Sequence, residues 1–232
     1  MKRLLLATGL WVLLSSGLLA QTEPIGRRKN FYLHSALNLH ITDVNELNAE
    51  LVRAGHLPFD GIQVGRGGGF YTLFPKVRLA SLFNFSTYSK IKSGQNRTNW
   101  IRATQAGTSL GLLVRNSEHL QLIPYAGVLY SWLGVRVASA QPVPGSTAGY
   151  LSGPSNQHHM RSNQFMGNLG IHLARTGFGR TALGQRLMAG VRVGYFVPIG
   201  ANQWKTGLTT LSDGPDTNAG GFYTSLVVGL AQ

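Results

Sequence analysis

Eight stretches of this 232-residue chain alternate, residue by residue, between apolar side chains and polar or small ones. Because successive side chains of a β-strand point to opposite faces, this period of two predicts strands with one apolar and one polar face. The clearest stretch sets Leu187, Ala189, Val191, Val193, Tyr195 and Val197 against Arg186, Met188, Gly190, Arg192, Gly194 and Phe196. The eight stretches cover residues 31–41, 62–71, 76–86, 105–114, 120–138, 165–173, 186–197 and 222–230. Each is long enough to cross a bilayer as a tilted strand, which needs about 9–11 residues.

The connections between these stretches alternate in length. The shorter ones are residues 74–75, 116–119 and 176–184, and the longer ones are residues 42–60, 89–98, 139–162 and 198–218. Transmembrane barrels have short turns on the periplasmic side and longer loops outside. The predicted fold is therefore all-β: an eight-stranded antiparallel up-and-down transmembrane β-barrel whose first strand leaves the periplasm.

The first residues of the chain differ from the rest. A positive start at Lys2 and Arg3 precedes an almost purely apolar run, and small residues lead up to Ala20. This layout is typical of a secretory signal peptide, and the apolar run is shorter than the ~20 residues of a spanning helix. We expect residues 1–20 to be a signal peptide and residues 21–232 to form one outer-membrane β-barrel domain.

Composition narrows the class of protein further. Only 12% of the residues are charged and the mean hydropathy is +0.01, a middling value that alternating lipid-facing and lumen-facing residues produce. The absence of cysteine excludes disulfides, thiolate metal sites and a lipoprotein anchor. The formal net charge is +13, but the positive residues are scattered and the chain is exported, so nucleic acid is not the expected partner. Lipopolysaccharide phosphates or an electropositive lumen fit this charge better.

The first long connection carries a helix signal. Asp43 is followed three residues later by Glu46, which is the pattern of a capping box. Gly55 and Pro58 provide a stop. The apolar residues at helical spacing are Val44, Leu47 and Leu51. We predict a short amphipathic helix in the first external loop, which packs on the barrel rim as a lid; the alternative is a cover for a partner or ligand.

Basic side chains collect on the face predicted to point inward. The candidate ligand-binding residues of the lumen are Lys76, Arg78, Arg115, Arg186, Arg192 and His34. All eight acidic residues lie outside the predicted strand interiors, so water, tyrosine and amide side chains, or bound anions, must satisfy these cations. An eight-stranded interior is filled by side chains or holds one small ligand. We expect a plugged polar interior; the alternative is a narrow channel that prefers anions.

Three further motifs favour structural interpretations. Gly65, Gly67 and Gly69 are not followed by a helix, so they clear one face of a strand rather than cradle a phosphate. The adjacent histidines at 158 and 159 lack further metal ligands. His159 and Ser162 loosely suggest the catalytic pair of a lipid hydrolase, but no orienting acid lies near them in the sequence. We expect no metal, no cofactor and no catalytic residue.

Taken together, these features resemble the small outer-membrane barrels of the OmpA/OmpX transmembrane type. The glycine-rich stretch from Gln63 to Phe70, after a helix-like loop, is similar to β-barrel proteins of Bacteroidetes-like bacteria. The resemblance implies a place in the Gram-negative outer membrane, insertion by the barrel assembly machinery, and contact with outer-membrane lipid and lipopolysaccharide. It also implies a non-enzymatic, structural or surface-interaction role through the external loops. The alternatives are a narrow anion-preferring channel or anionic-ligand-binding barrel, and a barrel-embedded lipid hydrolase.

Overall fold

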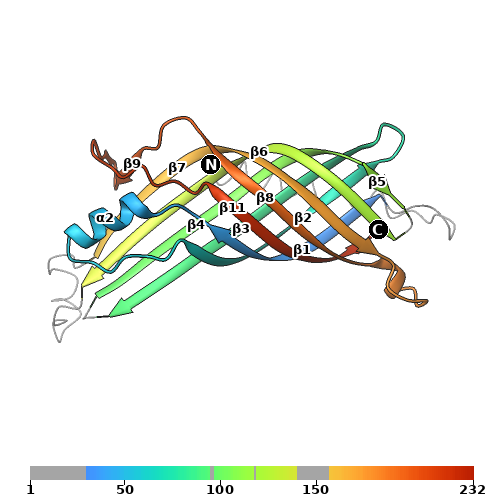
Figure 1. Cartoon of the computed structure of the whole chain (residues 1–232), viewed down its shortest axis with the longest axis horizontal. Coiled ribbons are helices and arrows are strands. Elements are labelled where there is room, and N and C mark those ends of the chain that lie inside the picture. The colour runs from blue at the N-terminus through green and yellow to red at the C-terminus, as the bar shows by residue number, and fades with distance from the viewer. Residues whose placement is uncertain (1–29, 95–96, 118, 140–156) are drawn as a thin grey trace.

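Eight long strands close an antiparallel barrel in the computed structural model, which describes residues 30–94, 97–117, 119–139 and 157–232 (Figure 1). They are β1 (Phe31–Ile41), β2 (Ile62–Phe74), β3 (Leu79–Gly94), β4 (Arg97–Leu112), β6 (Leu120–Ser139), β7 (Gln157–Thr176), β8 (Leu187–Ile199) and β11 (Gly221–Ala231). Each pairs with the next long strand in sequence, and β11 pairs with β1 to close the ring. The predicted fold class is confirmed. The predicted signal peptide lies outside the described residues.

Shorter elements decorate the two ends of the barrel. They are α2 (Asn45–Arg53), β5 (Arg115–Asn116), a 3-10 helix η1 (Gly184–Arg186), β9 (Trp204–Thr206) and β10 (Thr209–Thr210). β5 pairs with β6, and β9 extends the sheet from β7 and pairs with β10. Within the part of the chain that the structure describes, no helix has both the length and the apolar character to cross a membrane.

The outward face of the wall is apolar and uncovered. Leu33, Leu110 and Phe165 are 54%, 66% and 60% exposed, whereas their inward neighbours Tyr32 and Ser109 are buried. Such a continuous apolar surface is rare on a protein surrounded by water. A closed barrel leaves no strand edge unpaired, which is the condition for spanning lipid. The barrel is therefore a transmembrane structure of the outer membrane.

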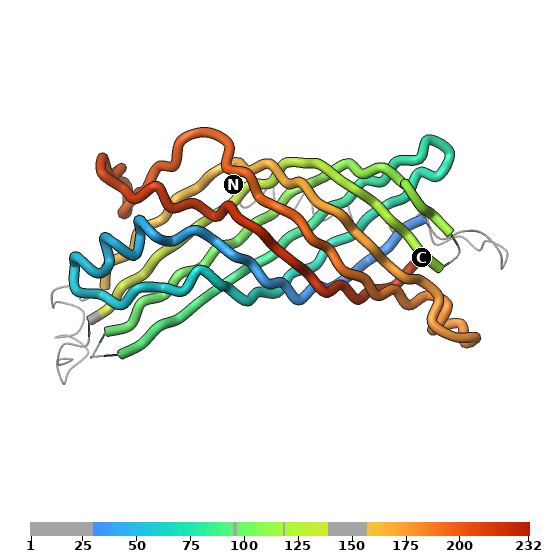
Figure 2. Tube along the Cα trace, viewed as in Figure 1, coloured from blue at the N-terminus to red at the C-terminus, as the bar shows by residue number. Residues whose placement is uncertain are grey.

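The strands fall into two groups by length. β3 and β4 have 16 residues each and β6 and β7 have 20 each, and we call these four neighbours the tall wall. β1 and β11 have 11 residues and β2 and β8 have 13, and these form the short wall. In Figure 1 the ends of β3 and β6 project to the left past the end of β1. The loops that leave the short wall at this end therefore start below the top of the tall wall (Figure 2).

One of the predicted long loops is wrong. Residues 89–98 are largely strand, because β3 and β4 continue their pairing up to Gly94 and Arg97. Similarly, β7 begins eight residues before the predicted stretch at 165–173. Most outward residues of these extensions are polar, with Ile91 and Trp100 as exceptions, so the continuous apolar face ends while the backbone pairing continues. Beyond the bilayer a strand needs a neighbour for its hydrogen bonds but no apolar side.

Side chains fill the lumen in two layers. The layer at the external end includes Leu47, Tyr88, Ile101, Leu133 and Trp204. The layer at the periplasmic end includes Tyr32, Tyr71, Leu82, Ile123 and Met188. The glycine-rich part of β2 passes close to β3, because a Cβ atom at Gly69 would clash with the carbonyl oxygen of Phe83. The structural interpretation of this glycine run is confirmed.

The helix in the first external loop is present, but its predicted capping box does not form. The carboxylate of Asp43 accepts a hydrogen bond from the backbone N–H of Asn45 at 3.0 Å. Glu46 instead accepts one from the backbone N–H of Asp216 at 2.7 Å, so the last external loop uses the acid that the motif assigns to the helix. Gly55 follows the helix with a φ of 75°, in the left-handed region that suits glycine at a helix end.

Candidate functional site

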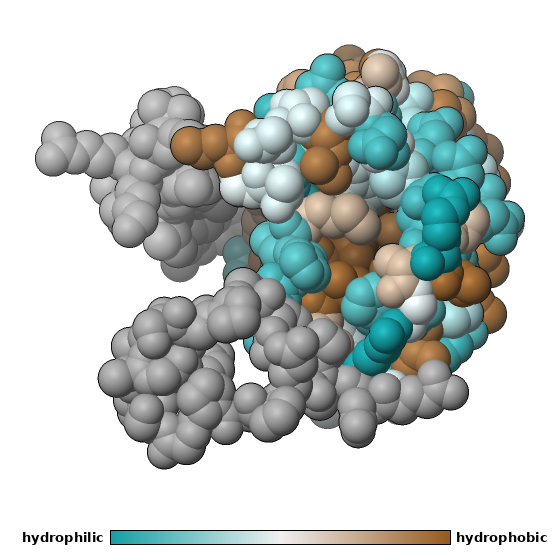
Figure 3. All heavy atoms as spheres, turned by 90° about the vertical axis from the view of Figure 1, so that its left-hand side faces the viewer, coloured by the Kyte–Doolittle hydropathy of each residue, from teal (hydrophilic) through white to brown (hydrophobic). Residues whose placement is uncertain are grey.

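The external loops 42–61 and 200–220 fold over the mouth of the barrel, and we call them the cap. Leu47 and Leu51 of α2 are buried and belong to the same apolar cluster as Ile101 and Val135 of the tall wall. The backbone N–H of Leu47 donates to the Thr217 hydroxyl at 3.1 Å, which joins the two loops. Figure 3 looks onto this end and shows brown apolar side chains in the middle, among teal and white ones. The predicted lid is confirmed.

Below the cap, hydrogen bonds cross the lumen between strands that are not neighbours. The Tyr71 hydroxyl on β2 donates to the Gln121 side-chain oxygen on β6 at 2.8 Å. The Tyr223 hydroxyl on β11 donates to the Asn168 side-chain oxygen on β7 at 2.7 Å, and it also bonds the hydroxyl of Tyr125. These ties hold bulky side chains across the middle of the barrel, so the lumen is plugged.

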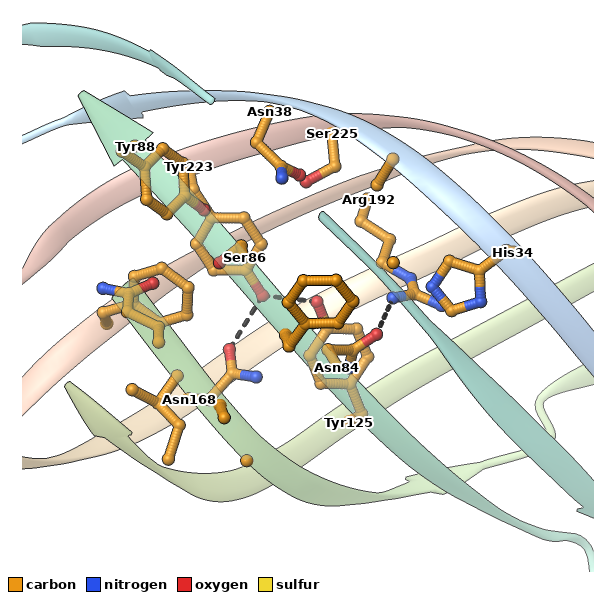
Figure 4. Close-up of a pocket in the computed structure, with 18 residues that line it drawn as sticks. His34, Asn38, Asn84, Ser86, Tyr88, Tyr125, Asn168, Arg192, Tyr223 and Ser225 are labelled. Carbon is orange, nitrogen blue, oxygen red and sulfur yellow. Dashed lines mark hydrogen bonds between the residues drawn. The ribbon is translucent and has the colours of Figure 1, made fainter. Parts of the chain in front are cut away.

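Arg192 of β8 is buried in the middle of this lumen and is only 5% exposed. Its Nε–H donates to Nδ1 of His172 at 3.1 Å, and its Nη1 donates to the side-chain oxygen of Asn84 (Figure 4). The Nη2 group has no hydrogen-bond partner among the described residues. All partners of this guanidinium are thus neutral.

No described carboxylate lies in the lumen to neutralise this charge. Every acidic residue that the structure describes belongs to the cap: Asp43, Glu46, Glu50, Asp60, Asp213 and Asp216. The described ion pairs join Glu50 to Arg53, and Asp60 to Lys90 and Lys92. The predicted separation of acids from the strand interiors is confirmed for these residues.

A cavity of about 40 Å³ lies beside Arg192 (Figure 4). Hydroxyl and amide groups of Asn38, Ser86, Tyr125 and Ser225 line it. Nδ2 of Asn38 is a second buried donor without a partner in the described structure. A cavity needs about 10–15 Å³ to hold one water. The site therefore has room for a few water molecules or one small ion; its unpartnered groups include two donors, Arg192 Nη2 and Asn38 Nδ2, and one acceptor, Gln105 Oε1.

The structure confirms the lumen position of two candidate residues and contradicts it for four. His34 and Arg192 are buried and line the same cavity. The other four side chains are exposed at the periplasmic end, in the β2–β3 turn, in β5 and in η1: Lys76, Arg78, Arg115 and Arg186. The alternation of inward and outward side chains ends where the strand ends, because the chain turns there and a charged side chain can reach water. We call these four residues the periplasmic rim.

The sequence predicts the neutral half of the site by residue type only, as tyrosine and amide side chains, and does not single out the individual residues. Four residues on inward-facing positions of their strands belong to this half: Asn38, Asn84, Tyr125 and Tyr223. The predicted ligands, in contrast, are all basic residues. The available signal was the repeated placement of tyrosine and asparagine on the inward face. Groups that both donate and accept hydrogen bonds are what a buried cation requires in place of carboxylates.

A second basic feature lies on the outward face of the tall wall. Arg102 on β4 and Arg161 on β7 both pair with Gly134 of β6, so they flank a position without a side chain. Arg136, two residues further along β6, pairs with His159. We call Arg102, Arg136, Arg161 and His159 the basic row; all four side chains are exposed.

Aromatic rings lie between the basic row and the apolar belt. Tyr130 contacts Trp132 and Phe165, with ring centroids 4.8 and 4.9 Å apart. Arg136 follows Trp132 by four residues, a distance of roughly 13 Å along a strand. The Arg136 guanidinium lies 5.5 Å from the ring centroid of Trp100. Aromatic girdles mark the level of the lipid headgroups, so the basic row lies at or just above it on the external side.

The His159 and Ser162 pair cannot act together. His159 is exposed on the outward face of β7, whereas Ser162 points inward, is buried, and donates to the side chain of Asn202. Among the described residues there is also no group of three or more potential metal ligands. The chemistry that these residues support is binding of anions, inside at Arg192 and outside at the basic row.

Comparisons with known proteins address the fold. Neither protein-family models nor curated protein sequences give a match. Among solved structures, a major outer membrane protein from Thermus thermophilus matches with a TM-score of 0.52 and 10% identity, over 87% of this chain and 98% of that one. Ail, the attachment invasion locus protein of Yersinia pestis, matches with a TM-score of 0.47 and 7% identity, over 88% and 99%. The resemblance to outer-membrane barrels is confirmed at the level of fold.

Proposed function

We propose that this chain is a non-conducting, non-enzymatic outer-membrane barrel that acts through its external face. The observation that carries the proposal is the plugged lumen. Two layers of buried side chains, tied by bonds such as Tyr71 to Gln121, fill the barrel below a cap that buries Leu47 and Leu51. Because the interior offers solutes no open path, contact with the surroundings falls to the cap and to the outer wall.

Recordings from planar bilayers test this proposal. We expect the purified native barrel to insert without conductance at either polarity. A triple variant, Tyr71→Ala, Tyr125→Ala and Tyr223→Ala, removes the crossing side chains and supplies the open control, provided that it still shows heat-modifiable migration on a gel. A steady anion-preferring current from the native protein would contradict the proposal and favour the channel alternative.

The partner that we propose for the outer wall is the phosphate-bearing lipopolysaccharide of the outer leaflet. The basic row supports it, because three arginines stand together at headgroup level and no described ion pair engages them. Arginine binds phosphate through two parallel hydrogen bonds, which are about twice as strong as neutral ones. Gly134 carries no side chain between Arg102 and Arg161, and Nε2 of His159 lies 3.4 Å from the position that a Cβ atom would take there, so the imidazole belongs to the same basic row.

Lipopolysaccharide binding by two charge-matched variants tests this partner. The first variant is Arg102→Gln, Arg136→Gln and Arg161→Gln, and the second removes the same charge from the periplasmic rim with Lys76→Gln, Arg115→Gln and Arg186→Gln. We expect at least about tenfold weaker binding of the first only, since a hydrogen bond to a charged group is worth about 1.5–3 kcal/mol. Lipopolysaccharide with its phosphates removed should bind native protein as weakly. An equal loss in both variants would refute a site at the basic row.

A further inference from the structure

The guanidinium of Arg192 is in an unusual position for a buried charge. Removing an ion from water is costly, and buried charges are normally paired with an opposite charge. Here the two identified partners, His172 and Asn84, are neutral and accept through one lone pair each. The remaining nitrogen of the guanidinium, Nη2, is buried without a partner in the described structure. The site therefore has one uncompensated positive charge and an NH2 group, with two N–H donors, that has no partner in the described structure.

The cavity beside Arg192 supplies what an anion requires. Asn38 contributes a second unpartnered N–H group, and the hydroxyls of Ser86 and Ser225 line the same space. The volume of about 40 Å³ accommodates a monatomic ion in place of a few waters. Water satisfies the donors but leaves the charge uncompensated, whereas an anion does both.

We propose that this cavity binds one monovalent inorganic anion of halide size, enclosed when the barrel closes. The ion takes the place that a lumen carboxylate would fill, which explains how β8 carries a buried arginine opposite strands that contain no acid among their described residues. The proposal is independent of the proposed function, because it concerns the interior of the barrel and not its outer wall.

Bromide identifies such a site directly. We would fold the mature chain in sodium bromide, crystallise it, and measure anomalous scattering at the bromine edge. The expected result is one strong peak within hydrogen-bond distance of Arg192 Nη2. In parallel, the unfolding temperature should rise with the logarithm of bromide or chloride concentration, because an ion that binds only the folded state stabilises it by mass action. Sodium gluconate at equal ionic strength provides the control anion, which is too large to enter.

Two variants separate this site from general salt effects. Asn84→Asp places a carboxylate on the guanidinium, so the protein should fold, lose the bromide peak and lose the halide dependence of its unfolding temperature. Arg186→Met removes an exposed cation of the periplasmic rim and should keep both. Absence of a peak in the native protein, with equal unfolding temperatures in halide and gluconate, would overturn the proposal. A halide effect that persists unchanged in Asn84→Asp would overturn it as well, since the ion would then bind elsewhere.

Discussion

Arg192 and the arginines of the basic row carry the same group in opposite surroundings. Inside the barrel, the guanidinium is fixed by His172 and Asn84 and is shielded from water. Outside, the guanidiniums of Arg102 and Arg161 are exposed and engaged in no described ion pair. Burial makes each interior polar group depend on a particular partner, while the exposed cations remain available to external charge. The interior cation is therefore expected to affect stability, whereas the exposed arginines are expected to affect contact with external anions.

The largest difference in stability between a buried and an exposed substitution is expected at the cap. Leu47→Ala removes a side chain that is fully buried against the tall wall, and such a change costs about 2–5 kcal/mol in a packed core. We expect the cap to open locally and become sensitive to protease, while the barrel keeps its heat-modifiable migration. Val52→Ala, on the exposed side of α2, is the matched control and should resist cleavage like the native protein. Equal cleavage of both variants would show that the cap is not held by its apolar side.

Two arginine substitutions on the outward face of β7 compare the apolar belt with the level of the lipid headgroups. Leu169→Arg places a charge in the middle of the apolar belt and should destabilise the barrel by about 2–4 kcal/mol. Asn163→Arg lies next to Arg161 and should cost about 0–1 kcal/mol, as charges near the interface do. Reversible urea unfolding in lipid vesicles measures both. If the two variants are equally unstable, the membrane boundary on β7 is misplaced.

A pair of hydroxyl deletions compares an inward tyrosine with an outward one. Tyr71→Phe leaves the buried Gln121 with one partner fewer, at a cost of about 1–3 kcal/mol. Tyr195→Phe removes a hydroxyl from an exposed outward ring and should change stability by less than about 0.5 kcal/mol. The same unfolding assay gives both values. Comparable costs at the two positions would remove the distinction between interior and outer wall.

The smallest effect concerns an exposed charge cluster at the cap. Lys90, and then Lys92, hold the pKa of Asp60 below its ordinary value of 3.8, with oxygen to nitrogen distances of 3.3 and 3.6 Å. A lowered carboxyl pKa stabilises the folded loop above the unfolded pKa, and this stabilisation is lost as pH falls through the folded pKa. Hydrogen exchange of the 42–61 loop should therefore quicken slightly below about pH 4. Asp60→Asn should show no such pH dependence, and an identical profile in both proteins would exclude Asp60 as its source.

The barrel itself is predictable from the sequence because lipid on one side and a filled interior on the other impose opposite polarity on adjacent residues. The inward positions of His34 and Arg192 follow from this rule. The ends of the strands do not. β3 continues to Gly94 because backbone pairing extends beyond the bilayer, where outward residues such as Ser89 are free to be polar.

The candidate site was predicted only in part, because the alternation of inward and outward side chains applies only within the strands. This alternation assigns Lys76 and Arg115 to the lumen. It does not apply in a turn or beside a strand end, where both residues lie and where both are exposed. The contact between Glu46 and Asp216 joins loops far apart in the sequence, so no local capping rule reveals it. The partnership of Arg192 with Asn84 depends on which strands face each other across the ring, and that follows only from closure.

The strands on which the cap helix docks imply an order of events during biogenesis. The surface that receives α2 includes Ile101 of β4 and Val135 of β6, which belong to strands made after the helix itself. We therefore expect the helix to lack this docking surface until β4 and β6 have formed. We expect residues 42–61 to acquire protease resistance late, so that its time course follows the later steps of insertion and not the first.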